Sequence, residues 1–336
     1  MSLALTASVE RVAEEIDFSG VVHVARRGVT VFECARGLAD RSHGIPNTID
    51  TQFAIASAVK GFTALAVMSL VRDGSLSLGT SVRSILGDDL ELIDPAVTVG
   101  HLLAHTSGIG DYLDESTLTD IDDYVLSVPV HELANTRDFL KVLRGHPMKF
   151  VPGDRFEYCN GGYVVLALAI EAVGGASYHN FVTRKVFDPA GMSATAFFRL
   201  DQLPGSAAIG YVSAGDGRRT NHLHLPVRGS GDGGAYSTLG DFSRFWSALF
   251  AGKIVPRQIV DEMVRAHNDV PSDSRRYGLG FWLRADRDTV MLEGYDAGVS
   301  FRSSYDPASG FLYTVISNTS SGAWPIVKML DEMLPS

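Results

Sequence analysis

Ser57 and Lys60 are the residues whose types and spacing first suggest chemistry. They stand in "SAVKGFTALAVMSLV", where Lys60 is the only charged side chain before Arg72. Three residues apart on a helix, the two side chains share a face about one turn apart. A serine hydroxyl is a weak nucleophile until a base removes its proton, and burial lowers the pKa of a lysine so that it can be that base. The alternative is that Ser57 caps the helix while Lys60 extends to water.

The segment "GDRFEYCNGGY" supplies the next candidates, Tyr158 and Asn160, on either side of Cys159. A phenol close to a cation can relay a proton, so Tyr158 is a candidate to complete a proton-transfer set with Ser57 and Lys60. Tyr-x-Asn alone is a weak signal, because a core tyrosine beside a turn asparagine is the commoner explanation. A catalytic site made of these residues requires a fold that brings the segment of Ser57 and Lys60 close to the segment of Tyr158 and Asn160.

The strand patterns that would build this scaffold lie at both ends of the chain. Apolar, alternating segments bounded by turn residues predict strands near residues 20–28, 29–37, 52–56, 279–285, 289–294, 299–307 and 311–318. Helical patterns fill the middle, and amphipathic helices open and close the chain. We predict an α/β fold of the α+β type: one antiparallel sheet built from both chain ends, flanked by helices, with a mainly helical domain inserted.

The predicted elements divide the chain into two parts. Residues 1–75 together with 266–336 form the sheet-containing part, and residues 76–265 form the mainly helical part. Because Ser57 comes from the first part and Tyr158 from the second, we expect the active site in the cleft between them. An aromatic series at helical spacing is predicted to be core; it comprises Phe242, Phe245, Trp246 and Phe250.

Composition narrows the classes of function. The 336 residues carry a formal net charge of −10 without a cluster of Lys and Arg, which argues against a nucleic-acid partner. No apolar run reaches the roughly 18 residues needed to span a bilayer. The N-terminus lacks the basic start of a secretory signal, so we expect a cytoplasmic protein; a secreted form with its signal removed is the alternative. Cys34 and Cys159 are read as small buried residues rather than a disulfide.

Three other patterns imitate binding motifs. "GSGDGG" at residues 229–234 fits G-x-G-x-x-G but lacks the strand–helix context of a dinucleotide site. His101 and His105 are spaced to share a metal, without the glutamate of zinc proteases. His222 and His224 lack a third ligand, so a surface pair or cleft lining is favoured over a metal site. No metal or cofactor is predicted, and the absence of G-x-S-x-G disfavours an α/β-hydrolase fold.

Taken in order, several segments resemble the serine β-lactamase and penicillin-binding-protein superfamily. They are "SAVK", "LLAHTSGI", "FVPGDRFEYCNGGYVVLALAIEAVGG", "DPAGM" and "GDGGAYSTLGDFSRF". The chain is most similar to the branch with class C β-lactamases, D-aminopeptidases, D-stereospecific peptidases and related carboxylesterases. The resemblance covers about residues 17–318 and implies a sheet-and-helix fold of the kind predicted above.

The resemblance also implies residue roles. Ser57 matches the nucleophile, and Lys60 the residue that tunes or accepts its proton. Tyr158 matches the general base, which returns the proton to the leaving group, while Asn160 matches the residue that hydrogen-bonds substrate amides and the lysine. Tyr112 follows "HTSGIGD", where the family often has a substrate-side aromatic; the alternative is surface packing.

The third family motif, usually Lys-Thr-Gly or His-x-Gly, is altered. In "EGYDAGVSFRSS" we place Tyr295 at the Lys or His position and Ala297 at the Gly, so that the Gly298 N–H completes an oxyanion hole with the Ser57 N–H. A neutral Tyr295 cannot attract the carboxylate of β-lactams or D-alanyl peptides unless Arg302 or another cation replaces the missing charge.

These residues predict a serine hydrolase that forms an acyl-enzyme on Ser57. The expected substrates are small esters or amides without an essential carboxylate. One alternative is a β-lactamase, D-alanyl-D-alanine carboxypeptidase or D-aminopeptidase with an unusual third motif, which would take β-lactam-like or peptide substrates. A second is a non-catalytic relative that binds a ligand. The oligomeric state is not predicted.

Overall fold

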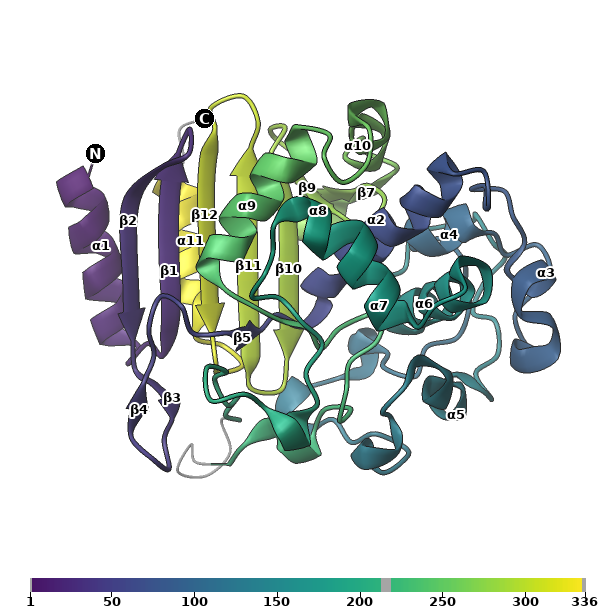
Figure 1. Ribbon diagram of the computed structural model, residues 1–336, viewed down its shortest axis with the longest axis horizontal. Coiled ribbons are helices and arrows are strands. Elements are labelled where there is room, and N and C mark those ends of the chain that lie inside the picture. Colours follow the sequence, from purple (N-terminus) through teal and green to yellow (C-terminus); the bar gives the residue numbers. More distant parts are fainter. Residues whose placement is uncertain (1, 213–218, 334–336) are drawn as a thin grey trace.

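The computed structural model describes residues 2–212 and 219–333, and a single antiparallel sheet of eight strands spans it (Figure 1). The strand order is β2-β1-β12-β11-β10-β9-β8-β7. The bounds are β1 Gly20–Arg26, β2 Val29–Arg36, β7 Asn268–Val270, β8 Arg275–Tyr277, β9 Trp282–Arg284, β10 Val290–Asp296, β11 Val299–Asp306 and β12 Phe311–Ser317. Both chain ends thus contribute to one sheet, as predicted.

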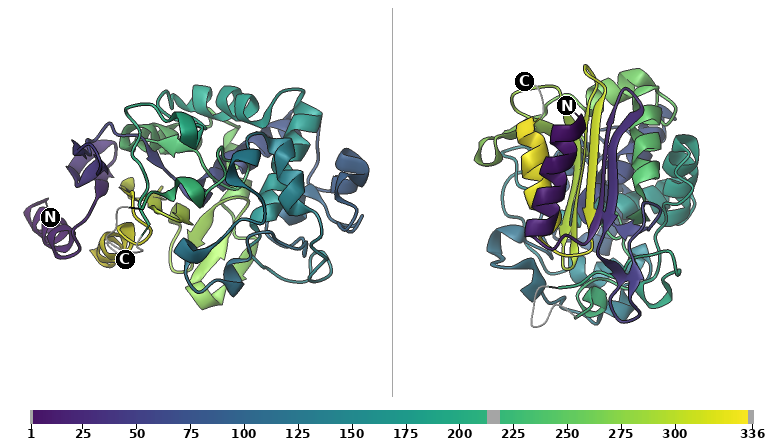
Figure 2. Two further views of the ribbon diagram at one scale, coloured as in Figure 1. Left: turned by 90° about the horizontal axis from the view of Figure 1, so that it is seen from below. Right: turned by 90° about the vertical axis from the view of Figure 1, so that its left-hand side faces the viewer.

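The junction between the two chain ends is the pairing of β1 with β12, which runs from Gly20 opposite Ser317 to Arg26 opposite Phe311. Helices α1 (Ser2–Glu15) and α11 (Ala323–Met333) cover one face of the sheet (Figure 2), and α9 (Leu239–Phe250) packs on the other. Because both faces are covered, every residue of β12 is buried.

The inserted helices pack around two long apolar ones, α2 (Val59–Arg72) and α6 (Asn160–Gly174). Most side chains of both helices are buried on all sides, which is why their sequences lack a polar face. The shorter helices are α3 Val82–Leu86, α4 Val99–Leu103, α5 Leu140–Leu143, α7 Tyr178–Val182, α8 Asp188–Ala190 and α10 Arg257–Met263. Two small ribbons pair β3 (Leu38–Asp40) with β4 (Ile45–Pro46) and β5 (Phe53–Ala54) with β6 (Tyr236–Ser237).

The predicted fold class is confirmed, although the sequence patterns missed β7 and β8. The sheet strands all fall within 1–75 and 266–336, whereas α9, from within 76–265, packs against β1 and β12. The division at those boundaries stays a prediction. Phe242, Phe245 and Trp246 are fully buried, as expected of core residues.

Two smaller observations concern the described residues only. No single helix among them is long and apolar enough to cross a membrane; α6 and the helical stretch from Tyr178 to Ala190 meet the requirement only as a pair bent by 79°. Neither cysteine is in a disulfide: Cys159 is buried and Cys34 is partly buried.

Candidate active site

Ser57 lies where β5 turns into α2. It sits in the single 3-10 turn Ala56–Ala58 that precedes the helix, so its N–H is among the donors that lack a partner at a helix start. Ala56 just before it has φ of +43°, a conformation that L-residues rarely adopt. This strained turn presents the half-buried Ser57 at the end of an otherwise buried helix.

Lys60, one turn into α2, is 2% exposed and aimed at Ser57. Its Nζ is 2.9 Å from Ser57 Oγ, 2.8 Å from Asn160 Oδ1 and 2.9 Å from the carbonyl oxygen of Asp232. Burial lowers the pKa of Lys60, and the nearby carboxylates of Asp232, Glu115 and Asp111 oppose that shift in part.

These three contacts define what Lys60 can do. The Asn160 and Asp232 oxygens accept hydrogen bonds only, so they take two N–H donors of the amine. A neutral amine then has its lone pair left for the third partner, the Ser57 hydroxyl, which can donate. The geometry fits a base that receives the serine proton.

Tyr158 lies against the other side of this group. Lys60 Nζ is 4.8 Å from the centroid of the Tyr158 ring, which also stacks on Trp282 at 5.9 Å. Desolvation raises the pKa of Tyr158 well above its usual value, and Glu115 adds to the rise, while the Ser57 hydroxyl opposes it. The phenol is therefore held in its neutral, proton-donating form.

His105 positions Tyr158 through hydrogen bonds to the residues before and after it. From the sequence, His105 was interpreted as a structural residue or a possible metal ligand. Its Nδ1 accepts the N–H of Cys159 at 3.0 Å, and its carbonyl oxygen accepts the N–H of Glu157 at 2.9 Å. Its ring packs on the Tyr158 ring at 4.4 Å. Burial lowers the pKa of His105 well below its usual value, so the imidazole stays neutral and keeps an acceptor at Nδ1.

Asn160, the first residue of α6, contacts Lys60 as expected, but its amide donors are already used. Nδ2 donates to the Leu113 carbonyl at 2.9 Å and to Glu115 Oε1 at 3.0 Å. The expected hydrogen bond from Asn160 to a substrate amide is therefore not available without a rearrangement of Glu115. Here the side chain links Lys60 to the loop at residues 113–115.

Two buried aspartates near Lys60 were missed by sequence reasoning. Asp111 accepts the N–H groups of Asn160 and Gly161 at 2.6 and 2.8 Å and so caps α6; burial raises its pKa to about 6. Asp232, in the glycine-dense loop, accepts a hydrogen bond from the Tyr112 hydroxyl. Tyr112 lines the same cavity as Ser57.

The third motif differs from its predicted alignment. Gly294, three residues before Ala297, approaches the Ser57 turn: a Cβ there would be 2.0 Å from the Ile55 carbonyl oxygen. The Gly298 N–H donates to Ser320 Oγ at 2.8 Å, so it is not free to serve as the predicted oxyanion donor.

Tyr295 and Arg302 also depart from expectation. The Tyr295 ring contacts Trp324 of α11, although Tyr295 also lines both cavities that contain Ser57. Arg302 is 5% exposed and paired with Glu293 and with Asp331 of α11. Neither side chain supplies a cation to the site.

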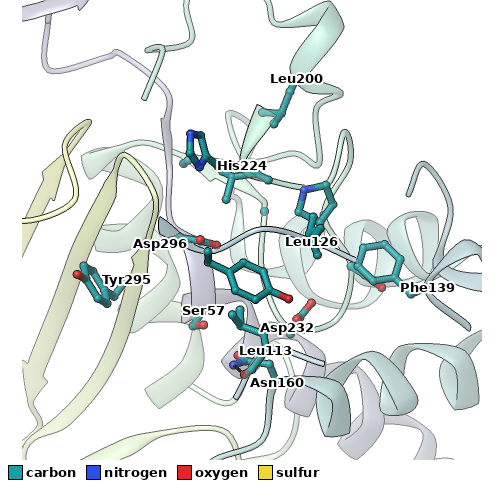
Figure 3. Close-up of a pocket in the computed structure, with 18 of the residues that line it drawn as sticks. Ser57, Leu113, Leu126, Phe139, Asn160, Leu200, His224, Asp232, Tyr295 and Asp296 are labelled. Carbon is teal, nitrogen blue, oxygen red and sulfur yellow. Dashed lines mark hydrogen bonds between the residues drawn. The ribbon is translucent and has the colours of Figure 1, made fainter. Parts of the chain in front are cut away.

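Two cavities meet at Ser57. The first is shown in Figure 3; its walls include Leu126, Phe139, Leu200 and the two carboxylates Asp232 and Asp296. The second is lined by Tyr158, Phe156, Trp282, Arg275 and Glu293. The site therefore has one mainly apolar side and one side that contains the phenol.

The remaining motif-like patterns have structural partners. His101 Nδ1 accepts the N–H of Thr98 at the start of α4, so it does not share a metal with His105. His224 lines the first cavity. Among the described residues, no three His, Cys, Asp or Glu side chains are grouped to hold a metal ion.

Comparison with known proteins identifies the family. The Beta-lactamase family model matches residues 6–332. This chain belongs to the Beta-lactamase family. It is a serine hydrolase of the fold shared by penicillin-binding proteins, esterases, amidases and peptidases.

Individual relatives agree with this assignment. The chain is 26% identical to the putative penicillin-binding protein PbpX of Bacillus subtilis over 92% of this chain and 73% of PbpX. It is 31% identical to esterase EstB of Burkholderia gladioli over 82% of this chain and 76% of EstB. A crystal structure of a penicillin-binding protein from Bacillus halodurans superposes with a TM-score of 0.90 at 36% identity, covering 97% of this chain and all of that one.

Proposed function

We propose that this Beta-lactamase family member hydrolyses small carboxylic esters, and related amides, that lack an essential carboxylate. Ser57 attacks the carbonyl carbon, forms an acyl-enzyme and releases it with water. The observation that carries this proposal is the 2.9 Å contact of Ser57 Oγ with the Nζ of Lys60, a lysine that is only 2% exposed. The similarity to esterase EstB supports the ester as the substrate class.

In this proposal Lys60 and Tyr158 carry different proton transfers, because their pKa values are shifted in opposite directions. The lowered pKa of Lys60 makes it the acceptor of the Ser57 proton, and the raised pKa of Tyr158 makes it the donor to the leaving group. Because Tyr158 lines only the second cavity, the leaving group departs there and the acyl group occupies the first.

The oxyanion donors in this proposal are the N–H groups of Ser57 and Tyr295. β9 pairs with β10 only at Val290 and Met291, so the edge of β10 beside the Ser57 turn is not paired with β9. Gly294 lets this edge approach the turn. Each such donor lowers the barrier by about 3 kcal/mol.

The charges around Ser57 favour neutral substrates over β-lactams. Among the described residues, no lysine or arginine lines the first cavity. Arg275 in the second cavity is bonded to Glu293 at 2.9 Å, and this pairing offsets its charge. A substrate carboxylate would thus meet carboxylates without an unpaired cation to hold it.

The test compares p-nitrophenyl butyrate with a chromogenic cephalosporin, with Ser57→Ala as the control. We expect ester turnover that the variant loses by at least about 10³-fold, and little cephalosporin turnover. Rapid cephalosporin turnover would replace this proposal with a β-lactamase. If neither substrate reacts and a fluorophosphonate probe does not label Ser57, the protein is a non-catalytic binder and the proposal fails.

A further inference from the structure

Asp296 is a charged residue of the first cavity that the proposed reaction does not use. It ends β10 two residues after Gly294, so the two residues share the face of the strand that meets the Ser57 turn. Asp296 and Ser57 line the same cavity, and Figure 3 shows the Asp296 side chain beside it. Tyr295, between Gly294 and Asp296, packs its ring on Trp324.

One oxygen of Asp296 has a local role. Its Oδ1 accepts the N–H of Ala297 at 2.9 Å, a common arrangement in a tight turn. Among the described residues, none forms a hydrogen bond or an ion pair with Asp296 Oδ2, and no lysine or arginine lines the cavity. An asparagine would close the same turn without a partly buried charge, so the turn alone does not account for a carboxylate here.

The charged and titratable groups around Asp296 are mostly acidic. Those that face it from neighbouring elements are Asp232, Glu115, Tyr124, His224 and, beneath Ser57, Lys60. Lys60 opposes the rise in the pKa of Asp296, but it is bonded to three other groups and makes no hydrogen bond with Asp296. The acyl side of the site is therefore an apolar cavity with negative charge and no accessible positive charge.

We infer that Asp296 is a specificity-determining residue that binds an ammonium group on the acyl part of the substrate. The apolar walls take the carbon skeleton, and Asp296 Oδ2 accepts a hydrogen bond from, or lies beside, the cationic nitrogen. The same carboxylate repels acyl groups that carry an acid. This inference rests on the proposed esterase function and names its preferred substrate class, amine-bearing acyl esters and amides.

The preference depends on pH in a defined direction. Burial raises the pKa of Asp296 to about 7, with Asp232 and Glu115 adding to the rise and the Ala297 N–H opposing it. Above that pH the carboxylate is charged and favours a cation. Below it the carboxyl is neutral and the discrimination disappears.

The experiment uses two p-nitrophenyl esters of nearly equal shape, 4-(trimethylammonio)butanoate and 5,5-dimethylhexanoate. The first keeps its positive charge at every pH, so only the enzyme titrates. The measured quantity is the ratio of kcat/KM for the cationic ester to that for the neutral one, which cancels changes in the shared machinery. Asp296→Asn keeps the turn acceptor, and Asp306→Asn is the matched control, because Asp306 accepts a turn N–H at the far end of β11.

We expect the wild-type ratio to rise as pH increases through about 7 and to fall by about fivefold to fiftyfold in Asp296→Asn, with Asp306→Asn unchanged. An unchanged ratio in Asp296→Asn while the neutral ester is still hydrolysed would overturn this inference and leave the esterase proposal standing. Loss of turnover of both esters by the wild-type protein would overturn the esterase proposal and this inference together.

Discussion

At the scale of single residues, the site depends on one buried amine. Lys60 has 2% exposure and three oxygen partners within 2.9 Å, which is an unusual environment for a lysine. The hydrogen bonds stabilise its position, while burial disfavours its charge. Both effects are needed, because a base must be aimed at the Ser57 proton and must also be neutral at working pH.

Replacement of Lys60 with arginine separates position from basicity. Arginine keeps a cation near Ser57 but does not lose its proton at accessible pH. We expect kcat/KM for p-nitrophenyl butyrate to fall by about 10²–10⁴-fold. In the wild type, kcat/KM should rise with pH along a limb that lies below the usual lysine pKa of 10.5, because the shift is downward. A wild-type limb near 10.5, or equal activity in Lys60→Arg, would contradict the role of Lys60 as the base.

At the residue scale, the sequence was sufficient for some parts of the site and insufficient for others. Spacing within one helix places Lys60 one turn from Ser57, so that contact could be predicted. The register of the partner strand does not follow from its pattern, because a shift of one residue moves every side chain of a strand to the other face. Tyr295 borders both cavities at Ser57 as expected, but its ring packs on Trp324 of α11, which the sequence did not indicate.

At the scale of elements, the important arrangement is the junction of α4, the loop at Tyr158 and α6. His105 follows α4 and has φ of +55°. Through one ring nitrogen and one carbonyl oxygen it holds the residues on both sides of Tyr158. We interpret His105 as a positioning residue, which acts on the reaction only through the orientation of the phenol.

This interpretation predicts different outcomes for three substitutions. His105→Asn keeps an acceptor near the Nδ1 position and tolerates positive φ, so kcat should stay within about tenfold of wild type. His105→Leu lacks the acceptor and should lower kcat about 100-fold with little change in KM, because the phenol is displaced. His101→Asn, at the start of α4, is the matched control. Equal kcat values for His105→Leu and His105→Asn would contradict the positioning role.

The short strands show where prediction of elements from sequence fails. β10, β11 and β12 have seven or eight residues each and are mostly buried, so their patterns are clear. β7 and β8 have three residues each and include exposed or charged side chains, so local pattern does not distinguish them from loop. β8 is defined by its pairing with β7 and β9 rather than by its own side-chain pattern.

At the scale of the whole molecule, an ion network connects the C-terminal helix to the border of the site. In this network Arg302 pairs with Glu293 and with Asp331 beneath α11. Glu293 also lines the second cavity at Ser57. The network links β10, β11 and α11, so it ties the C-terminal helix to the strand that borders the active site.

Removal of the central cation of this network should affect stability more than chemistry. Arg302→Met removes the shared partner of two carboxylates, of which Glu293 keeps Arg275 and Asp331 keeps Arg284. The substitution should lower the free energy of unfolding by about 1.5–3 kcal/mol. Arg302 lowers the pKa of Glu293, so this stabilisation is present above the unfolded pKa of that carboxyl and is lost as pH falls through the folded one. Denaturant unfolding at several pH values measures both effects.

The control for this prediction is ester turnover per folded molecule at 25 °C. It should remain near wild type, because the Arg302 side chain faces away from Ser57. A large loss of turnover with unchanged stability would show that Arg302 acts on the reaction after all. Glu293→Gln, which removes one of its two partners, should be less stable than wild type in the same assay.

The pairing of β1 with β12 also has a consequence for folding during synthesis. Gly20 pairs with Ser317, so β1, which pairs early with β2, gains its second neighbour only after residues 311–317 have left the ribosome. Until then one edge of the β1–β2 hairpin is unpaired, and contacts across so many residues form slowly. The sheet that borders Ser57 can therefore be completed only after β12 has been synthesised.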